Sequence, residues 1–289
     1  MTVFRKELAD HFTSWRFIVL FTIVFAVGII AIYLDAQYIR AEVIDTRFVF
    51  LKLYTSSGEL VPLLTFFLVF FMPIIGIVLG FDAINSERNN GTLSRLLAQP
   101  IFRDSVINAK FLAGIITIAI MLVSMVMLVG GLGLRMIGVP PSPEEVIRLM
   151  AFIGAGVVYA AFWLGLAMLF SIFLKRVATS ALVSIALWMF FIFLFVFPSF
   201  VQLGKLGFLV MMLSPITIFS EIISTLLIPS ARTMGQILQT TSGLVPANPL
   251  SLGQSLLHIW PHLVSLLALT AVCFAISYIK FMREEIRST

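Results

Sequence analysis

The chain has 289 residues, of which 60% are hydrophobic and only 11% are charged, and its formal net charge is +5. Because roughly a quarter of the residues in a soluble domain are charged, this composition excludes a soluble globular protein and indicates a polytopic membrane protein. The basic residues mostly flank apolar runs, which is a pattern of membrane orientation and not of nucleic-acid binding. We therefore predict no nucleic-acid partner.

An amphipathic helix is predicted over residues 1–15, before the first apolar run. Its large apolar residues recur at intervals of three or four and are Phe4, Leu8, Phe12 and Trp15. Charged residues fall between them, so the segment is expected to lie in the plane of the lipid headgroups. The next apolar run is too long for a signal peptide and no A-x-A-like cleavage site follows it, which predicts an uncleaved span.

Six apolar segments that lack Asp, Glu, Lys and Arg are expected to cross the membrane as helices. They cover residues 17–34, 61–81, 111–134, 149–174, 177–197 and 261–279. Spans of about 20 residues fill the chain, so residues 1–289 are predicted to form one all-α transmembrane domain, and an ATPase, if one is needed, would be another chain.

The connection over residues 82–110 is the most polar interruption and is predicted to form a structured loop in water. Asn90-Gly91 predicts a turn, and Thr92 is a candidate N-cap of a short helix that ends before Pro100. The apolar face of this helix would consist of Leu93, Leu96 and Leu97. The spacing alone leaves open whether this face docks on a partner or lies on the lipid interface.

Two longer connections are expected on the other side of the membrane. Residues 35–60 mix charged and aromatic side chains and predict an exposed connection with some interfacial helix. Residues 198–260 include an apolar run at 206–227, but this run contains Pro215 and Glu221. It is interpreted as a re-entrant or interfacial helical hairpin and not as a seventh span.

The charge distribution predicts the orientation. With six crossings, twelve of the nineteen basic residues and seven of the fourteen acidic residues share one side with both termini and residues 82–110. The other side carries seven of each sign. An excess of basic residues marks the cytoplasmic side, so both termini are predicted to be cytoplasmic.

Few residues are candidates for catalysis or metal binding. The sequence has no phosphate-binding loop, and its one cysteine, Cys273, lies within the last span. His258 and His262 are four residues apart, but Pro261 is expected to interrupt the helical register between them, which argues against a metal site. No catalytic residue, metal or cofactor is predicted for this chain.

A set of residues in and beside the polar loop carries a family resemblance. The set comprises Asp82, Glu87, Gly91-Thr92-Leu93, Leu96-Leu97, Pro100-Ile101, Arg103 and Lys110. Together with the amino-terminal helix, the six-span order and the outer Ser214-Pro215, it resembles the type-2 ABC transporter permease family. The chain is similar to the compact branch that includes sodium-efflux, bacteriocin-resistance and copper-maturation permeases for nitrous oxide reductase. Asn89-Asn90 departs from the charged residues that many relatives have there.

The resemblance implies a permease subunit, expected to be an exporter, in a prokaryotic cell (inner) membrane. Two permease subunits, expected to be a homodimer, would form the pathway, each with an elbow helix at residues 1–15. A coupling helix would seat in each of two ATPase subunits, which would bind ATP and Mg. Glu87 would pair with a basic residue at the cytoplasmic mouth of the permease. The implied coupling residues are Glu87, Gly91, Thr92, Leu93, Leu96, Leu97, Pro100 and Arg103.

Two alternatives from other functional classes stay open. In the first, the chain transmits ATP-driven motion to an extracytoplasmic partner through residues 35–60 and 198–260, without transport. Its sign would be an outer docking groove together with a dimer interface too tight for a cavity. In the second, the chain is a gradient-driven secondary transporter, which the uncharged spans disfavour because such proteins usually place ionisable groups at mid-membrane.

Overall fold

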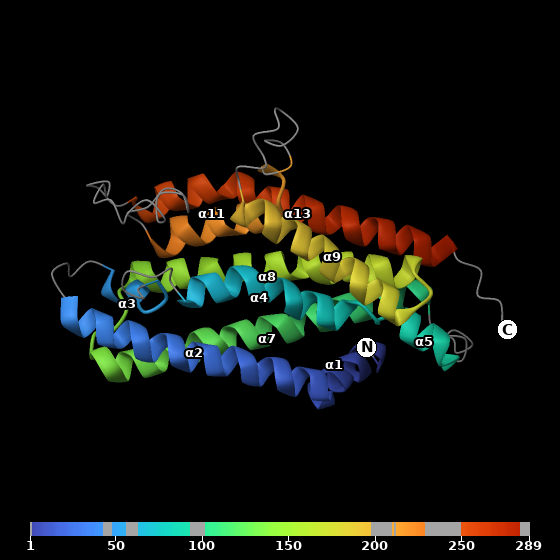
Figure 1. Ribbon diagram of the computed structural model, residues 1–289, viewed down its shortest axis with the longest axis horizontal. Coiled ribbons are helices and arrows are strands. Elements are labelled where there is room, and N and C mark those ends of the chain that lie inside the picture. The colour runs from blue at the N-terminus through green and yellow to red at the C-terminus, as the bar shows by residue number, and fades with distance from the viewer. Residues whose placement is uncertain are drawn as a thin grey trace.

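The computed structural model describes residues 2–42, 48–55, 63–92, 102–197, 210, 212–228 and 250–283. Within these ranges every regular element is a helix, so the predicted all-α class is confirmed (Figure 1). The helices are α1 (Thr2–Thr13), α2 (Trp15–Glu42), α3 (Val49–Lys52), α4 (Leu63–Gly80), α5 (Asn85–Asn89), α7 (Arg103–Ile137), α8 (Pro143–Phe173), α9 (Val177–Val196), α11 (Pro215–Leu227) and α13 (Leu252–Arg283).

Six helices in the described part of the chain are long and apolar enough to cross a membrane. They are α2, α4, α7, α8, α9 and α13, and they overlap the six predicted spans in order. At about 1.5 Å per residue, a helix of 20 residues covers the hydrocarbon core of about 30 Å. The prediction of a six-span, multi-pass membrane protein is therefore confirmed.

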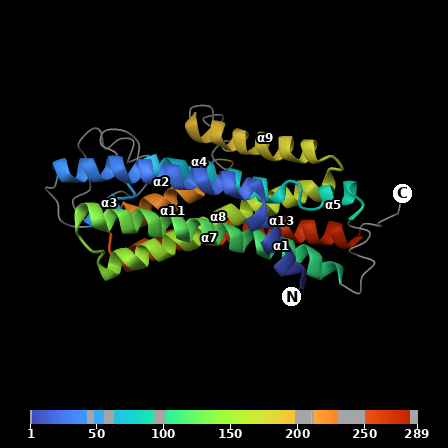
Figure 2. The ribbon, with the colours of Figure 1, turned by 90° about the horizontal axis from the view of Figure 1, so that it is seen from below.

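The long helices run side by side, so the bundle has two ends (Figures 1 and 2). The end that holds α1, α5, the start of α7 and the end of α8 is called the α5 end. The opposite end, which holds α3, the start of α8 and the start of α13, is called the α3 end. The described parts of the predicted loop and the amino-terminal helix thus lie at the same end.

Helix α8 runs through the middle of the bundle and packs against α4, α7, α9, α11 and α13 (Figure 1). Inside the molecule, 72% of its most apolar window is buried, compared with 11% for α9 and 17% for α13. The faces of α9 and α13 that point away from α8 carry exposed apolar side chains, which suits a hydrocarbon environment. The core of the protein is therefore built around α8.

Two glycines bring α4 into backbone contact with α8. A β-carbon on Gly76 would lie 2.6 Å from the carbonyl oxygen of Ala160, and one on Gly80 would lie 2.7 Å from that of Leu164. Close approach of this kind is the reason that small residues four apart occur in packed membrane helices. The contact fixes α4, and with it the start of the polar loop, against α8.

Residues 35–60 differ from the predicted exposed connection where the structure describes them. Helix α2 continues well past the predicted end of the first span, and both Leu53 and Tyr54 are fully buried. The Tyr54 hydroxyl donates a hydrogen bond of 2.9 Å to the carbonyl of Val126 on α7. A β-carbon on Gly133 would lie only 2.4 Å from Leu53, so this glycine makes room for the buried segment.

Helix α11 contains the described part of the apolar run at residues 206–227. Its 13 residues cover about 20 Å, which is too short to cross the membrane. All of them except Thr217 and Glu221 are buried, against α4, α8, α9 and α13. This burial disagrees with a helix lying on the lipid surface and fits a segment inserted among the spans.

The last long helix, α13, begins at Leu252 and continues through Pro261. The prediction that Pro261 interrupts the helix between His258 and His262 is therefore wrong. Proline removes one backbone hydrogen bond, but helices in membrane proteins accept it where neighbouring groups or water satisfy the freed carbonyl. The last span is thus extended toward the α3 end.

Candidate functional site

A buried ion-pair cluster lies at the α5 end, and Lys110 is at its centre. Lys110 lies near the start of α7 and is only 6% exposed. Its Nζ lies 2.8 Å from Oε2 of Glu7 on α1 and 2.9 Å from Oε1 of Glu87 on α5. One ammonium group thus joins the amino-terminal helix, the loop after the second span and the third span.

The cluster is stabilised by compensation of charge at a largely buried position. An unpaired ammonium group there would lose several kcal/mol of hydration, and two adjacent carboxylates without a cation would repel one another. The hydrogen bonds from Lys110 to Glu7 and Glu87 are charge-assisted and therefore stronger than neutral ones. The positions of α1, α5 and α7 are consequently linked.

A second ion pair joins α2 to the segment between α4 and α5. Arg16 donates a hydrogen bond to the carboxylate of Asp82, and its guanidinium carbon lies 5.2 Å from the centre of the Phe81 ring. About half of the Arg16 side chain is exposed, so solvent screens this pair. It supports the cluster around Lys110 but contributes less to stability.

A polar cavity of about 230 Å³ lies between these two ion pairs. Burial lowers the pKa of His11, which lines the cavity, and this effect outweighs the Glu7 carboxylate, which raises it. Oε1 of Glu7 and Oε2 of Glu87 are buried without a hydrogen bond from the described residues. The cavity is therefore lined by groups that can accept further hydrogen bonds.

Helix α5 is fixed at its start by α8. The hydroxyl oxygen of Ser171 accepts hydrogen bonds from the backbone N–H groups of Ile84, at 3.0 Å, and Asn85, at 3.1 Å. These are donors that the first turn of a helix leaves unpaired.

A turn follows the carboxyl end of α5. Gly91 there has a φ of +67°, which confirms the predicted turn and is a conformation that glycine adopts without strain. Thr92 donates to the carbonyl of Glu87.

The predicted coupling residues are only partly described by the structure. Glu87 reaches the ion-pair cluster, Gly91 and Thr92 follow α5, and Arg103 opens α7. The predicted coupling helix lies outside the described residues, and so do Leu93, Leu96, Leu97 and Pro100. Its docking role stays a prediction.

The predicted elbow helix corresponds to α1, which ends at Thr13. Phe4, Leu8 and Phe12 are half-buried on this helix, but Trp15 lies outside it and opens α2. The break occurs because the Ser14 hydroxyl accepts the N–H of Phe17 and so caps the new helix. The side chain of Trp15 is 76% exposed.

Two members of the site were not identified from the sequence. Glu7 was placed among the polar residues of α1, yet it is buried, and Ser171 was treated as part of an apolar span. A weak signal for Glu7 exists, because it is three residues from Phe4 and four from His11, on the face that turns inward. The sequence around Ser171 gives no indication that its hydroxyl holds the start of α5.

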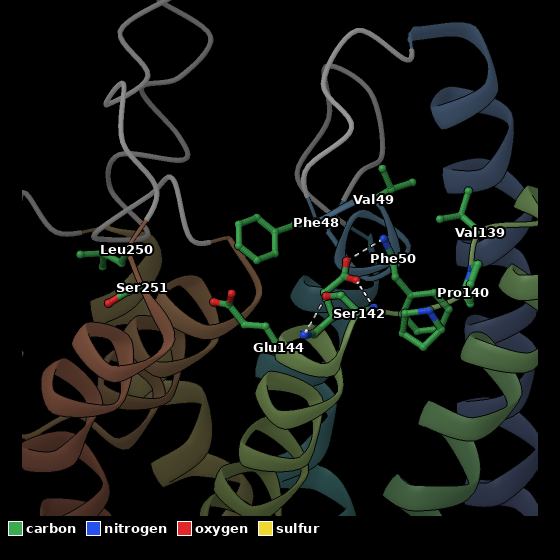
Figure 3. A pocket seen from close by; sticks show the side chains of 11 residues that line it. Phe48, Val49, Phe50, Val139, Pro140, Ser142, Glu144, Leu250 and Ser251 are labelled. Atoms are coloured by element: carbon green, nitrogen blue, oxygen red, sulfur yellow. Dashed lines mark hydrogen bonds between the residues drawn. The ribbon is translucent and has the colours of Figure 1, made fainter.

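A larger cavity, of about 710 Å³, opens at the α3 end. Figure 3 shows Leu250 and Ser251 on its α13 side, Val139 and Pro140 on its α7 side, and Phe48 with Glu144 between them. Glu145 lines this cavity and joins two of its walls. It forms a capping box with Ser142 at the start of α8, and its carboxylate also accepts a hydrogen bond from the backbone N–H of Phe50.

The fold and these two ends define a six-span helical membrane protein with a polar, ion-paired loop site. Within the described ranges, no three His, Cys, Asp or Glu side chains are grouped so as to hold a metal ion. The family model described as ABC-2 family transporter protein matches residues 1–286, so the chain belongs to that family. It is a permease subunit of an ABC transporter.

A curated relative agrees with this assignment. The chain is 31% identical over 198 residues to a protein of Pseudomonas aeruginosa named "Probable ABC transporter permease protein NosY". The aligned part covers 67% of this chain and 67% of that protein.

Proposed function

We propose that this chain is the membrane subunit of an ABC exporter and that ATP hydrolysis in a separate subunit drives it. The ATPase docks on residues 82–110, two copies of each subunit assemble, and the permease pair is a homodimer. ATP and Mg bind in the ATPase, and this chain holds no cofactor of its own. The observation that carries the proposal is Lys110, which bonds Glu7 and Glu87 at once.

The ion-pair cluster gives the loop a direct path into the membrane domain. A force on the loop reaches Glu87 on α5, and the charge-assisted bond passes it to Lys110 on the third span. The bond from Lys110 to Glu7 moves α1 in the same step. Because the partners are buried and paired, the elements move together or the cluster must break at a cost of several kcal/mol.

The proposed orientation places the α5 end in the cytoplasm of a prokaryotic cell, with both termini there. Arg5, Lys6 and Arg16 lie before or at the start of the first long helix, and Lys280 and Arg283 lie in the last turn of α13. Basic residues concentrate on the cytoplasmic side of membrane proteins, which supports this orientation.

Co-purification tests the proposed docking. The tagged chain is isolated from its native membrane, and the bound proteins are identified for the wild type and for a Leu96→Asp, Leu97→Asp double variant. We expect an ABC ATPase with the wild type and its loss from the double variant. Asn89→Asp is the matched control, because it adds a negative charge at an exposed position of α5 and leaves the leucines intact. ATPase retention by the double variant would contradict the proposed docking face.

The cavity at the α3 end favours a second candidate, in which ATP-driven motion acts on an extracytoplasmic partner without transport. A groove of about 710 Å³ between α3, α8 and α13 is large enough to accept side chains of a docked protein. The two candidates differ in a vesicle assay. Net movement of cargo into inverted vesicles supports the exporter, and nucleotide-dependent binding of an outer partner without such movement supports the second candidate.

A further inference from the structure

Helix α8 touches the polar loop at one end of the bundle and α11 at the other. We propose that α8 is a transmission rod, which carries movement of the loop to α11 through two hydrogen-bonded anchors, Ser171 and Arg148. This inference rests on the proposed function, because it assumes that an ATPase moves the loop. It adds the route by which that movement reaches the α3 end.

The first anchor is at the α5 end. The Ser171 hydroxyl on α8 holds the backbone of Ile84 and Asn85 at the start of α5. Just before this point in the chain, Gly76 and Gly80 set α4 into backbone contact with α8. Movement of the start of α5 therefore acts on α8 through these hydrogen bonds and through the close backbone contact of α4.

The second anchor is at the α3 end, where Arg148 is fully buried. Its Nη1 donates to the carbonyls of Thr225 and Leu226, in the last turn of α11, at 3.4 and 3.3 Å. The same nitrogen donates to Ser255 on α13 at 3.0 Å, and Nη2 donates to the carbonyl of Leu250 at 2.8 Å. A single side chain of α8 thus holds α11 and the start of α13.

The charge of Arg148 is compensated on the same helix. Nε and Nη2 both donate to Oε1 of Glu144, one turn earlier, at 3.1 and 2.9 Å. The guanidinium carbon also lies 5.4 Å from the centre of the Phe48 ring, and Phe48 has a φ of 55°, which is unusual for a bulky residue. A cation at the carboxyl end of α11 further suits the negative end of that helix dipole. All the N–H donors of Arg148 are accordingly used.

The geometry between the anchors is that of a rigid element. Ser171 and Arg148 lie on one uninterrupted helix, roughly 35 Å apart at 1.5 Å per residue. Between them Tyr159 donates to the carbonyl of Val69 on α4 at 2.8 Å and its ring stacks on Phe219 of α11. A packed helix that is held at both ends transmits a displacement from one end to the other.

Hydrogen exchange measured by mass spectrometry on the purified permease–ATPase complex provides the test. Exchange in α5 and in α11 is compared without nucleotide and with Mg-ATP trapped by vanadate. The variants are Ser171→Ala and Arg148→Lys. The first removes the hydroxyl that holds the start of α5, and the second keeps the positive charge but loses the guanidinium group that bonds α11 and the start of α13 together. The controls are Ser184→Ala, a buried serine whose hydroxyl donates to the carbonyl of Ser180 within α9, and Arg135→Lys, an exposed arginine at the α3 end.

We expect trapped nucleotide to change exchange in both α5 and α11 of the wild type and of both controls. Ser171→Ala and Arg148→Lys should keep the change in α5 and reduce the change in α11 by roughly threefold or more. An undiminished change in α11 of both variants overturns the rod, as does a wild-type response limited to α5. A wild type that responds in neither helix overturns the proposed function itself and the rod with it.

Discussion

Lys110 and Glu7 are 103 residues apart in sequence, yet Nζ of Lys110 lies 2.8 Å from Oε2 of Glu7, and both side chains are buried. The pair, extended to Glu87, joins the amino-terminal helix, the polar loop and the third span. Most of the consequences that we expect at the α5 end follow from this contact.

Loss of the ammonium group at Lys110 should strongly destabilise the protein. Lys110→Met leaves Glu7 and Glu87 buried without a cation, which we expect to cost about 3–5 kcal/mol of unfolding free energy. Thermal unfolding in detergent measures the effect. Lys6→Met, at an exposed position, should change stability by less than about 1 kcal/mol.

A charge-neutralising combination separates charge from packing at the same site. Glu7→Gln and Glu87→Gln added to Lys110→Met remove the uncompensated carboxylates, so we expect much of the lost stability to return. Unfolding temperatures of the single and triple variants, measured in the same detergent, provide the comparison. A triple variant less stable than Lys110→Met would show that the carboxylates are not the cause of the loss.

Close packing of α4 on α8 predicts a steep dependence on side-chain size at Gly76. Gly76→Ala places a methyl group within 2.6 Å of the Ala160 carbonyl oxygen, so the helices must separate, and we expect a loss of about 1–3 kcal/mol. Gly154→Ala, on α8, meets no atom within 4 Å and should be neutral or stabilising by about 1 kcal/mol. Equal effects in an unfolding assay would argue against the packed contact.

The pKa of His11 gives the folded protein a predictable response to acid. Burial lowers this pKa in the folded state, so below the usual value of 6.5 the unfolded chain binds a proton that the folded chain does not. Stability contributed by neutral His11 should therefore be lost as pH falls from about 7 toward the folded pKa. His11→Gln should flatten this part of the unfolding-temperature profile, and an unchanged slope would exclude His11 as its source.

The sequence predicted those parts of the fold that depend on local composition. The six predicted apolar runs form six long helices, and Asn90-Gly91 forms the predicted turn. The run that contains Pro215 and Glu221 forms a helix too short to span the membrane. Hydrocarbon requires each spanning segment to satisfy its own backbone, so these features follow from neighbouring residues alone.

Features that depend on distant contacts were not predictable in this way. Arg148 directly precedes a predicted span, and it is held by carbonyls more than 70 residues away in the sequence. Burial of Glu7 depends on its pairing with Lys110. A single sequence does not identify the partners in these pairings, because the paired residues have no characteristic local spacing.

Photo-cross-linking from the loop tests the central claim most directly. A benzophenone amino acid replaces Leu96 or, as a control at the α3 end, Val139, and the native membranes are irradiated before purification. We predict a covalent product with an ABC ATPase from position 96 and none from position 139. A position-96 variant that retains ATPase co-purification but forms no such product, or equal products from both positions, would contradict coupling through this loop.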